Sequence, residues 1–278
     1  MKKILVPCDF SPAAEEAFYF ATKIAEKDGS EIHLLYVIDS SLANNTASEL
    51  AHVAAFNGVF IQKLEEQLQE KFQGLKSKYD AEHISISLRV ELGLLSQNIE
   101  RYIKEKSIDI VVMGTSGATG LKEIFVGSNT EKIVRMAKVP VVAVPLGSST
   151  DTITDIVFPV DPTEDPSNYL KELRFIQRLF KAKLQILWVN TQNLFKSDTE
   201  AMEDLRDFAE EYRLRDYKLN VRSDHSEHEG ILRFAAGIEN ALLFMPTHSR
   251  KGIAHWLTGS ITENVVNHVE CPVWTCSL

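Results

Sequence analysis

The chain has 278 residues, of which 44% are apolar and 25% charged, and its formal net charge is −9 at pH 7. This length predicts about two domains, and the acidic balance argues against a nucleic-acid-binding protein, which usually carries a basic face. No window approaches the roughly 20 apolar residues of a membrane span, and the apolar run in MKKILVPCDF is too short for a signal peptide, so we expect a cytoplasmic protein without a membrane partner.

The first half of the chain alternates short apolar runs with longer amphipathic segments. Strands are predicted at Lys3–Pro7, Ile32–Ile38, Ile84–Val90, Ile108–Met113 and Pro140–Val144. Helices are predicted from Ser11-Pro12, over a long stretch that ends near Leu75, over Ser96–Lys106 and over Gly127–Ala137. Apolar strands separated by helices indicate a parallel sheet that helices cover on both faces.

The same pattern restarts after a short polar linker at 147–150. Asp161 and the strand before it match Asp9 and the first strand at an offset of 152 residues, whereas GSITENVV at 259–266 matches GSNTEKIV at 127–134 at an offset of 132. The difference places about 20 extra residues in the first half, most simply at 40–60. The chain therefore holds two copies of one α/β unit, and we expect domains at 1–147 and 151–278.

Glycines and a serine follow the fourth predicted strand. Gly114 and Gly117 come directly after it, and Gly127-Ser128 opens the last helix of the first half. Glycines let the backbone approach a ligand closely, and the free N–H groups of a helix start suit a phosphate. Asp9, after the first strand, offers an acceptor for a sugar hydroxyl or an exocyclic amine. If the first and fourth strands are neighbours, these residues share a crevice at the carboxyl ends of the strands and describe a nucleotide site.

The spacing resembles that of the ATP-binding branch of the universal stress protein family, which has Gly, two residues, Gly, nine residues, Gly and then Ser or Thr. The resemblance also covers VPCDFS at 6–11, YVID at 36–39 and VPVVAVP at 139–145, and it extends over both halves. It implies two tandem Rossmann-like or flavodoxin-like α/β units, each a five-stranded parallel sheet of order 3-2-1-4-5. The two units would form an intramolecular pseudo-dimer with pseudo-twofold symmetry, packed through their last strands, Val141–Val144 and Val273–Cys276.

The resemblance also implies which residues bind an adenine nucleotide, either ATP, with or without Mg²⁺, or AMP or ADP. They follow the first, second and fourth strands and open the last helix: Asp9, the backbone of Val37, Gly114, Gly117, Gly127, Ser128 and Asn129. Asp9 and the backbone of Val37 would hold adenine and ribose. The two glycines after the fourth strand would line the ribose and the first phosphates, and the start of the last helix would bind the later phosphates. The implied role is a stress-response or regulatory protein in which nucleotide occupancy is the signal. A plainer alternative is that the glycines only allow a tight loop and close helix packing.

The second half departs from this motif. Pro246 and Ser249 stand where Gly114 and Gly117 stand, although Asp161 and the Gly259-Ser260 pair remain. Proline fixes φ and removes an N–H group, and Ser249 adds a side chain where a ligand would approach. We therefore predict one nucleotide per chain, in the first half, and a second half that is mainly structural or interacting.

Two rival functions stay open: a slow ATPase or phosphotransferase, and an interaction module that needs no nucleotide. The chain has no Walker-type motif and no G-x-S-x-G elbow, and we can name no catalytic residue, so we expect at most slow ATP hydrolysis. Lys122 and Glu123 could cover phosphates or form a solvated charge pair. Association of two chains into a homodimer is also left open.

Histidines and cysteines provide weaker signals. His225, His228 and Glu229 have a metal-like spacing, but a solvated polar helix start is the better interpretation, and we expect no metal. His248 and His255 could bind an anion when protonated or lie on the surface.

The three cysteines, at 8, 271 and 276, are too few for a disulfide framework, so we expect reduced, buried or half-buried thiols. The last two are predicted to share a strand. The extra segment at 40–60 could cover the nucleotide, bind a partner or form the first turns of the long helix.

Overall fold

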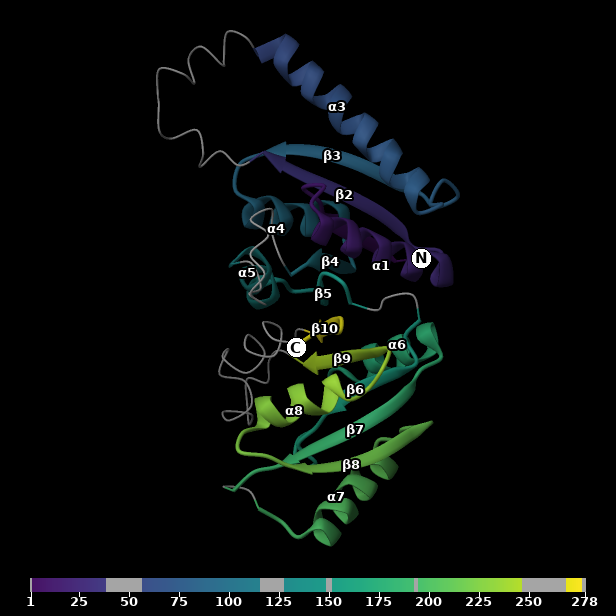
Figure 1. Cartoon of the computed structure of the whole chain (residues 1–278), viewed down its shortest axis with the longest axis vertical. Coiled ribbons are helices and arrows are strands. Elements are labelled where there is room, and N and C mark those ends of the chain that lie inside the picture. The colour runs from purple at the N-terminus through teal and green to yellow at the C-terminus, as the bar shows by residue number, and fades with distance from the viewer. Residues whose placement is uncertain are drawn as a thin grey trace. The chain divides into compact units, whose positions relative to one another are not determined.

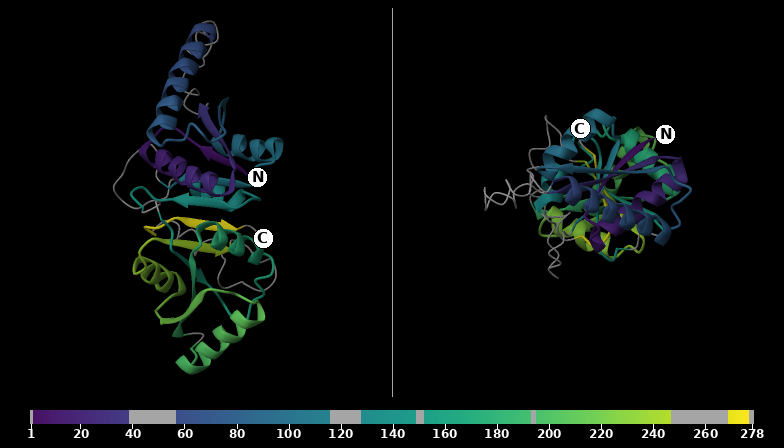
Figure 2. Two further views of the ribbon diagram at one scale, coloured as in Figure 1. Left: turned by 90° about the vertical axis from the view of Figure 1, so that its right-hand side faces the viewer. Right: turned by 90° about the horizontal axis from the view of Figure 1, so that it is seen from above.

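The computed structural model describes residues 2–38, 57–115, 128–148, 152–192, 195–246 and 269–276, with side chains from 63 onward in the long helix and from 129 onward in the last helix of the first repeat. The chain divides into two compact units, Met1–Met113 and Gly114–Leu278. Each unit is a layered α/β structure of mostly parallel strands and covering helices (Figures 1 and 2). No described helix is long and apolar enough to cross a membrane.

The strands and helices follow the alternation predicted from the sequence. In the first unit they are β1 (Lys3–Pro7), α1 (Pro12–Asp28), β2 (Glu31–Ile38), α3 (Asn57–Lys78), β3 (Ile86–Leu92), α4 (Leu95–Lys106) and β4 (Ile110–Gly114), whose last residue belongs to the second unit. In the second unit they are α5 (Ser128–Met136), β5 (Val141–Val144), β6 (Asp155–Pro159), α6 (Leu170–Phe180), β7 (Lys183–Asn190), α7 (Asp198–Glu211), β8 (Tyr217–Ser223), α8 (Glu227–Ala236), β9 (Ala241–Pro246) and β10 (Val273–Cys276).

Helix α1 shows how local sequence sets an element. The Ser11 side chain caps the helix by accepting a hydrogen bond from Ala14 N at 3.3 Å, and Pro12 occupies the first helical position, where its missing N–H costs nothing. The helix ends at Gly29, whose φ of 72° is the left-handed conformation that glycine adopts easily. Between these ends, a face of small and aromatic side chains that includes Phe18 is buried against the sheet.

In the first unit, β1 pairs in parallel with β2 on one side and with β4 on the other, and β2 pairs with β3, which gives the order β3-β2-β1-β4. The first and fourth strands are therefore neighbours, as the nucleotide-site hypothesis requires. Helices α1 and α3 cover one face, where Glu15 and Lys78 form an ion pair at 2.5 Å. Helix α4 covers the other face, where the Tyr102 ring lies 5.7 Å from that of His33.

In the second unit the order is β5-β10-β9-β6-β7-β8, and all neighbours are parallel except β5 and β10. The second repeat thus has the predicted order 3-2-1-4-5, read as β8-β7-β6-β9-β10. The end of the first repeat's fifth strand is tied to the residue that follows its fourth strand, because Thr115 N donates a hydrogen bond to Val144 O at 3.1 Å. The predicted fold class is confirmed.

Strands β5 and β10 join the two repeats within the second unit. They pair antiparallel with Val142 opposite Trp274, and these two residues are equivalent at the repeat offset of 132. A residue that faces its own repeat equivalent lies beside the pseudo-twofold axis, so the expectation that the last strands pack together is confirmed. Thr275 Oγ1 adds a buried hydrogen bond of 2.8 Å to Val141 O across this pair.

The starts of the third and fourth strands and the place of one cysteine are among the differences from the sequence predictions. The third and fourth strands begin two residues later than predicted, because Ile84 and Ile108 lie in turns before them. The N–H of Ile84 donates to Ala81 O, and the N–H of Ile108 donates to Ile103 O. Both isoleucines are buried, so each apolar run begins before the first residue that pairs in the sheet.

Cys271 does not share a strand with Cys276, because β10 begins only at Val273. All three cysteines are free, two of them buried and Cys271 half-buried, as predicted. The segment 39–56 and the side chains of 57–62 lie outside the described residues, so the alternatives for the extra segment are not tested.

Candidate functional site

The turn after β1 places the first predicted ligand residue. Asp9 is exposed, and its Oδ1 accepts a hydrogen bond of 2.9 Å from Ser11 N, which fixes the carboxylate at the start of α1. Between them Phe10 has a φ of 59°, a left-handed conformation that costs a non-glycine residue about 1–2 kcal/mol. The Phe10 ring lies 6.0 Å from that of Tyr36 and 5.7 Å from Lys71 Nζ. The Asp9 carboxylate thus lies at the carboxyl end of β1 and is hydrogen-bonded to the start of α1.

Val37 lies at the carboxyl end of the neighbouring strand. It is the second-last residue of β2, half-buried and in register with Glu91 of β3. Because β1 and β2 are parallel neighbours, Asp9 and Val37 lie at the same edge of the first unit's sheet. The structure therefore brings together these two predicted residues.

Gly114 and the start of α5 are joined in the second unit. Thr130, which is 2% exposed, donates a hydrogen bond of 2.8 Å from Oγ1 to Gly114 O. Ser128 is the first residue of α5, and Asn129 is exposed on its first turn. The sequence analysis missed Thr130, although its place in the repeated GSNTEKIV motif, two residues after Ser128, was a usable signal.

Several predicted residues lie outside the described part of the chain. They include two motif glycines, the loop charge pair, two histidines and the degenerate loop of the second repeat: Gly117, Gly127, Lys122, Glu123, His248, His255, Ser249 and Gly259-Ser260. The Ser128 side chain is not described either.

The second repeat keeps the aspartate turn. Asp161 follows β6, and its Oδ1 accepts hydrogen bonds from Thr163 N at 2.9 Å and from Thr163 Oγ1 at 2.7 Å. This is the arrangement of Asp9 and Ser11 at the same offset of 152. Pro246 closes β9 and is half-buried. The turn geometry is thus retained where the glycine motif is lost.

Two further carboxylates, which sequence reasoning missed, gather beside Asp161. Glu164 is half-buried in the turn after β6, and Glu227, which is 9% exposed, opens α8. Burial, together with the negative charges of Asp161 and Glu227, raises the pKa of Glu164 to about 7. The equivalent positions in the first repeat hold Pro12 and Leu95, so the repeat alignment was the signal that could have found them.

The raised pKa of Glu164 predicts a pH-dependent stability. Because the folded-state pKa of about 7 exceeds the ordinary value of 4.5, the folded chain binds this proton more tightly than the unfolded chain. The resulting stabilisation is fully present below pH 4.5 and is lost as the pH rises through 7. Glu164→Gln should therefore raise the thermal midpoint at pH 8 and leave it nearly unchanged at pH 4.5. The exposed control Glu203→Gln should change little at either pH, and equal effects of Glu164→Gln at both would contradict the prediction.

The histidines of the HSEHE segment lie at a helix start. Ser226 is the N-cap of α8, and its Oγ accepts a hydrogen bond of 3.4 Å from Glu229 N. His225 precedes the helix and is exposed, whereas His228 is half-buried in the first turn. Within the described ranges no three His, Cys, Asp or Glu side chains are grouped so that they could hold a metal ion.

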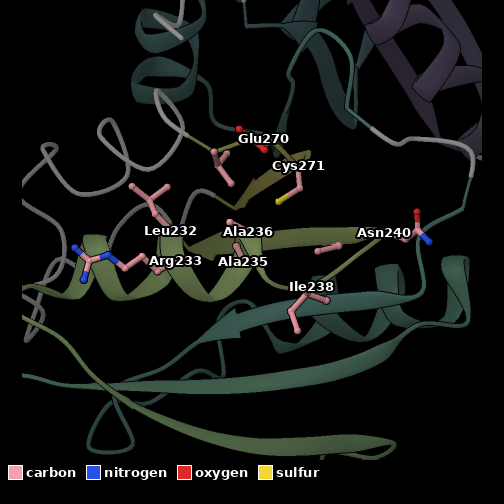
Figure 3. A pocket seen from close by; sticks show the side chains of 10 residues that line it. Leu232, Arg233, Ala235, Ala236, Ile238, Asn240, Glu270 and Cys271 are labelled. Atoms are coloured by element: carbon pink, nitrogen blue, oxygen red, sulfur yellow. The ribbon is translucent and has the colours of Figure 1, made fainter.

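A cavity of about 330 Å³ lies elsewhere in the second unit (Figure 3). Its walls come from the second half of α8, the turn before β9 and the segment before β10, and they include Ala235, Ile238 and Cys271. Ala241, the first residue of β9, also lines it, so the cavity opens at the amino end of that strand, away from the carboxyl-end crevice. Burial raises the pKa of Cys271 to about 12, which disfavours the thiolate form.

Comparison with known proteins agrees with this arrangement. Residues 1–145 and 152–277 each match the model of the universal stress protein family. Universal stress protein Slr1230 of Synechocystis is 26% identical over 294 residues and covers 99% of both chains. Universal stress protein MJ0577 of Methanocaldococcus jannaschii is 30% identical over 152 residues, which cover 51% of this chain and 94% of that protein.

Among solved structures, a universal stress protein from Archaeoglobus fulgidus has a TM-score of 0.73 and 21% identity, and the match covers 99% of this chain and 98% of that one. This likeness shows the fold. The twofold match of the family model, with the internal repeat, shows the lineage: the chain belongs to the universal stress protein family and carries its domain twice in tandem.

Proposed function

We propose that this protein is an ATP-binding regulatory protein in which the first repeat, 1–147, binds the nucleotide and the second, 151–278, is mainly structural or interacting. The observation that carries the proposal is the complete Gly114, Gly117, Gly127-Ser128 spacing between β4 and α5. The hydrogen bond from Thr130 to Gly114 O supports it, because this contact holds the helix start against the strand end that the motif follows.

Each group of predicted residues would bind a different part of the nucleotide. Asp9 and the backbone of Val37 would hold ribose and adenine at the ends of β1 and β2. Gly114 and Gly117 would let the backbone approach the ribose and the first phosphates. The start of α5, with Gly127, Ser128 and Asn129, would donate N–H and hydroxyl hydrogen bonds to the later phosphates.

The second repeat would bind no ATP. Pro246 replaces the first motif glycine and removes an N–H donor, and Glu164 and Glu227 bring negative charge to the turn after β6. A triphosphate would meet like charges there, which disfavours binding.

Calorimetric titration with ATP tests this proposal, and we expect a stoichiometry near one per chain. Gly127→Val should weaken ATP binding at least tenfold, which corresponds to about 1.4 kcal/mol, because its side chain would occupy the space of the phosphates. Thermal midpoints of both proteins serve as the folding control.

A stoichiometry near two would show that the second repeat accepts ATP in spite of Pro246. Unchanged affinity in a folded Gly127→Val protein would place the phosphates elsewhere, and no binding by the wild-type protein would favour the nucleotide-independent interaction module.

A further inference from the structure

Strand β3 leaves one edge of the first unit's sheet unpaired within the described part of the chain, because its one neighbour there is β2. At the two ends of this pair, Ile32 N donates to Ser85 O at 2.9 Å and Gly93 N donates to Ile38 O at 3.0 Å. The register between these ends runs without a gap, so the odd-numbered residues direct their backbone groups toward β2. The even-numbered residues of β3 therefore direct their N–H and C=O groups outward, where a further strand can pair.

The apolar face of β3 is incompletely covered. Leu88 and Val90 are half-buried, and Leu92 at the end of the strand is 65% exposed. Leu94, just beyond the strand, is 40% exposed. A groove of about 410 Å³ lies between Leu88, Val90 and exposed polar side chains of α3. Apolar surface thus accompanies the unpaired backbone groups along this edge.

Helix α3 extends past the same edge. In both views its first turns lie beyond β3, on the side away from β2 (Figures 1 and 2). The apolar stripe of the helix loses its cover in this direction, because Phe72 and Leu68 are buried whereas Leu64, one turn nearer the helix start, is half-buried. A strand added to β3 would lie beneath these turns and cover the stripe.

The sequence of this edge is complementary to itself. Residues 88–92 read Leu-Arg-Val-Glu-Leu, so an antiparallel copy centred on Val90 places Arg89 opposite the partner's Glu91 and each leucine opposite a leucine. Because the backbone of Val90 points outward, this register makes Val90 and its copy a hydrogen-bonded pair. The two charged pairs then occupy the closer, non-hydrogen-bonded positions, where opposite charges stabilise a sheet.

The charges also select this register against its neighbours. An antiparallel pairing centred one residue earlier would place Arg89 opposite its own copy, and one centred a residue later would do the same to Glu91, which is unfavourable. Both side chains lie on the α4 face, where Arg89 Nε donates to Glu91 Oε1 at 2.8 Å and Arg101 donates to Glu91 Oε2 at 2.9 Å. The paired chains would extend these contacts into a network of alternating charge.

The equivalent edge strand of the second repeat, β8, lacks this complementarity. Its sequence, YKLNVRS, has two positive charges, Lys218 and Arg222, and no negative one. Ser223 stands at the position of Leu92, because these residues end the equivalent registers with β7 and β2. Cations on an edge strand are a common protection against pairing with another chain. The self-complementary pattern therefore belongs to the first repeat.

We propose that β3 is a self-association surface through which two copies of this chain pair antiparallel, about a twofold axis at Val90. Such an interface is isologous, with the same residues contributed by both chains. Backbone hydrogen bonds and the burial of Leu92 and Leu94 provide the affinity, and Arg89 and Glu91 fix the register. The sheet of one chain would continue into that of the other.

Light scattering after size-exclusion chromatography of the full chain tests this proposal. At about 100 μM we expect twice the chain mass of 31.3 kDa. Val90→Pro should be monomeric, because proline removes an outward N–H and no hydrogen bond to β2. Val221→Pro is the matched control at the equivalent position of β8, where the N–H also points outward, and it should stay dimeric. Thermal midpoints check that both variants fold.

Charge reversal tests the register. Arg89→Glu and Glu91→Arg should each weaken self-association about tenfold or more, because each places like charges opposite one another. An equal mixture of the two variants should form mixed dimers, since every charge then faces its opposite, and native mass spectrometry with one variant isotope-labelled detects them.

Three results would overturn the assignment. One is a wild-type protein that is monomeric at about 100 μM. Another is a dimer that folded Val90→Pro or both charge variants leave unchanged, which would place the interface on another surface. The third is failure of the two charge variants to associate when mixed. None of these results depends on nucleotide binding, so the proposed function stands or falls separately.

Discussion

Replacing Trp274 by alanine should lower the free energy of unfolding of the second unit by about 3–5 kcal/mol, the usual cost of removing a large buried aromatic side chain. Trp274 is completely buried in β10, between Val142 of β5 and Phe244 of β9, and its ring centroid lies 6.3 Å from that of Phe175 in α6. The cavity would open beside the pseudo-twofold axis, where the two repeats share their sheet. Urea denaturation followed by circular dichroism measures the loss.

Trp274→Phe is the control for this experiment. The indole N–H of Trp274 has no hydrogen-bond partner in the described part of the chain. Phenylalanine therefore reduces the buried side-chain volume without removing a hydrogen bond. We expect it to cost about 1 kcal/mol, in the range of conservative core changes. If Trp274→Ala lowered the free energy of unfolding by less than 1 kcal/mol, the packing around the β5–β10 pair would contribute little to stability.

Gly230→Ala should destabilise the second unit by about 2–3 kcal/mol, because overpacking a filled core forces neighbours to move. A Cβ at Gly230 in α8 would lie 2.5 Å from Val189 Cγ1 and 3.0 Å from Val189 Cγ2. Val189 is fully buried in a cluster with Ile231, Ala235 and Leu243, so it has no space to withdraw into. Thermal and urea unfolding measure the change.

Gly74→Ala in α3 is the matched helix-glycine control. A Cβ there would have no atom within 4 Å, so alanine should stabilise the chain by about 0.5–1 kcal/mol through helix propensity alone. Gly230→Ala combined with Val189→Ala should recover part of the lost stability relative to the sum of the two single changes. Stabilisation by Gly230→Ala alone would contradict the close approach of α8 to β7.

The sequence by itself determined the repeated α/β pattern and the cap of the first helix. These features are local or periodic. Ser11 and Pro12 start α1 through contacts within the helix's own first turn, and the repeat offset between Asp9 and Asp161 can be read directly from the sequence. The family resemblance added the strand order and the pairing of the last strands, and the observed sheet confirms both. The nucleotide-binding residues stay a prediction, supported by spacing and by the position of Asp9 and Val37 at one sheet edge.

Only the tertiary structure decided which distant groups meet. Glu164 and Glu227 are 63 positions apart and look like ordinary charged residues, yet the charge of Glu227 contributes to the raised pKa of Glu164. The contact of Thr130 with Gly114 and the close approach of Gly230 to Val189 were equally invisible. Periodicity reports which face of an element is buried, but the distance between two packed elements depends on side chains that the chain brings together only when it folds.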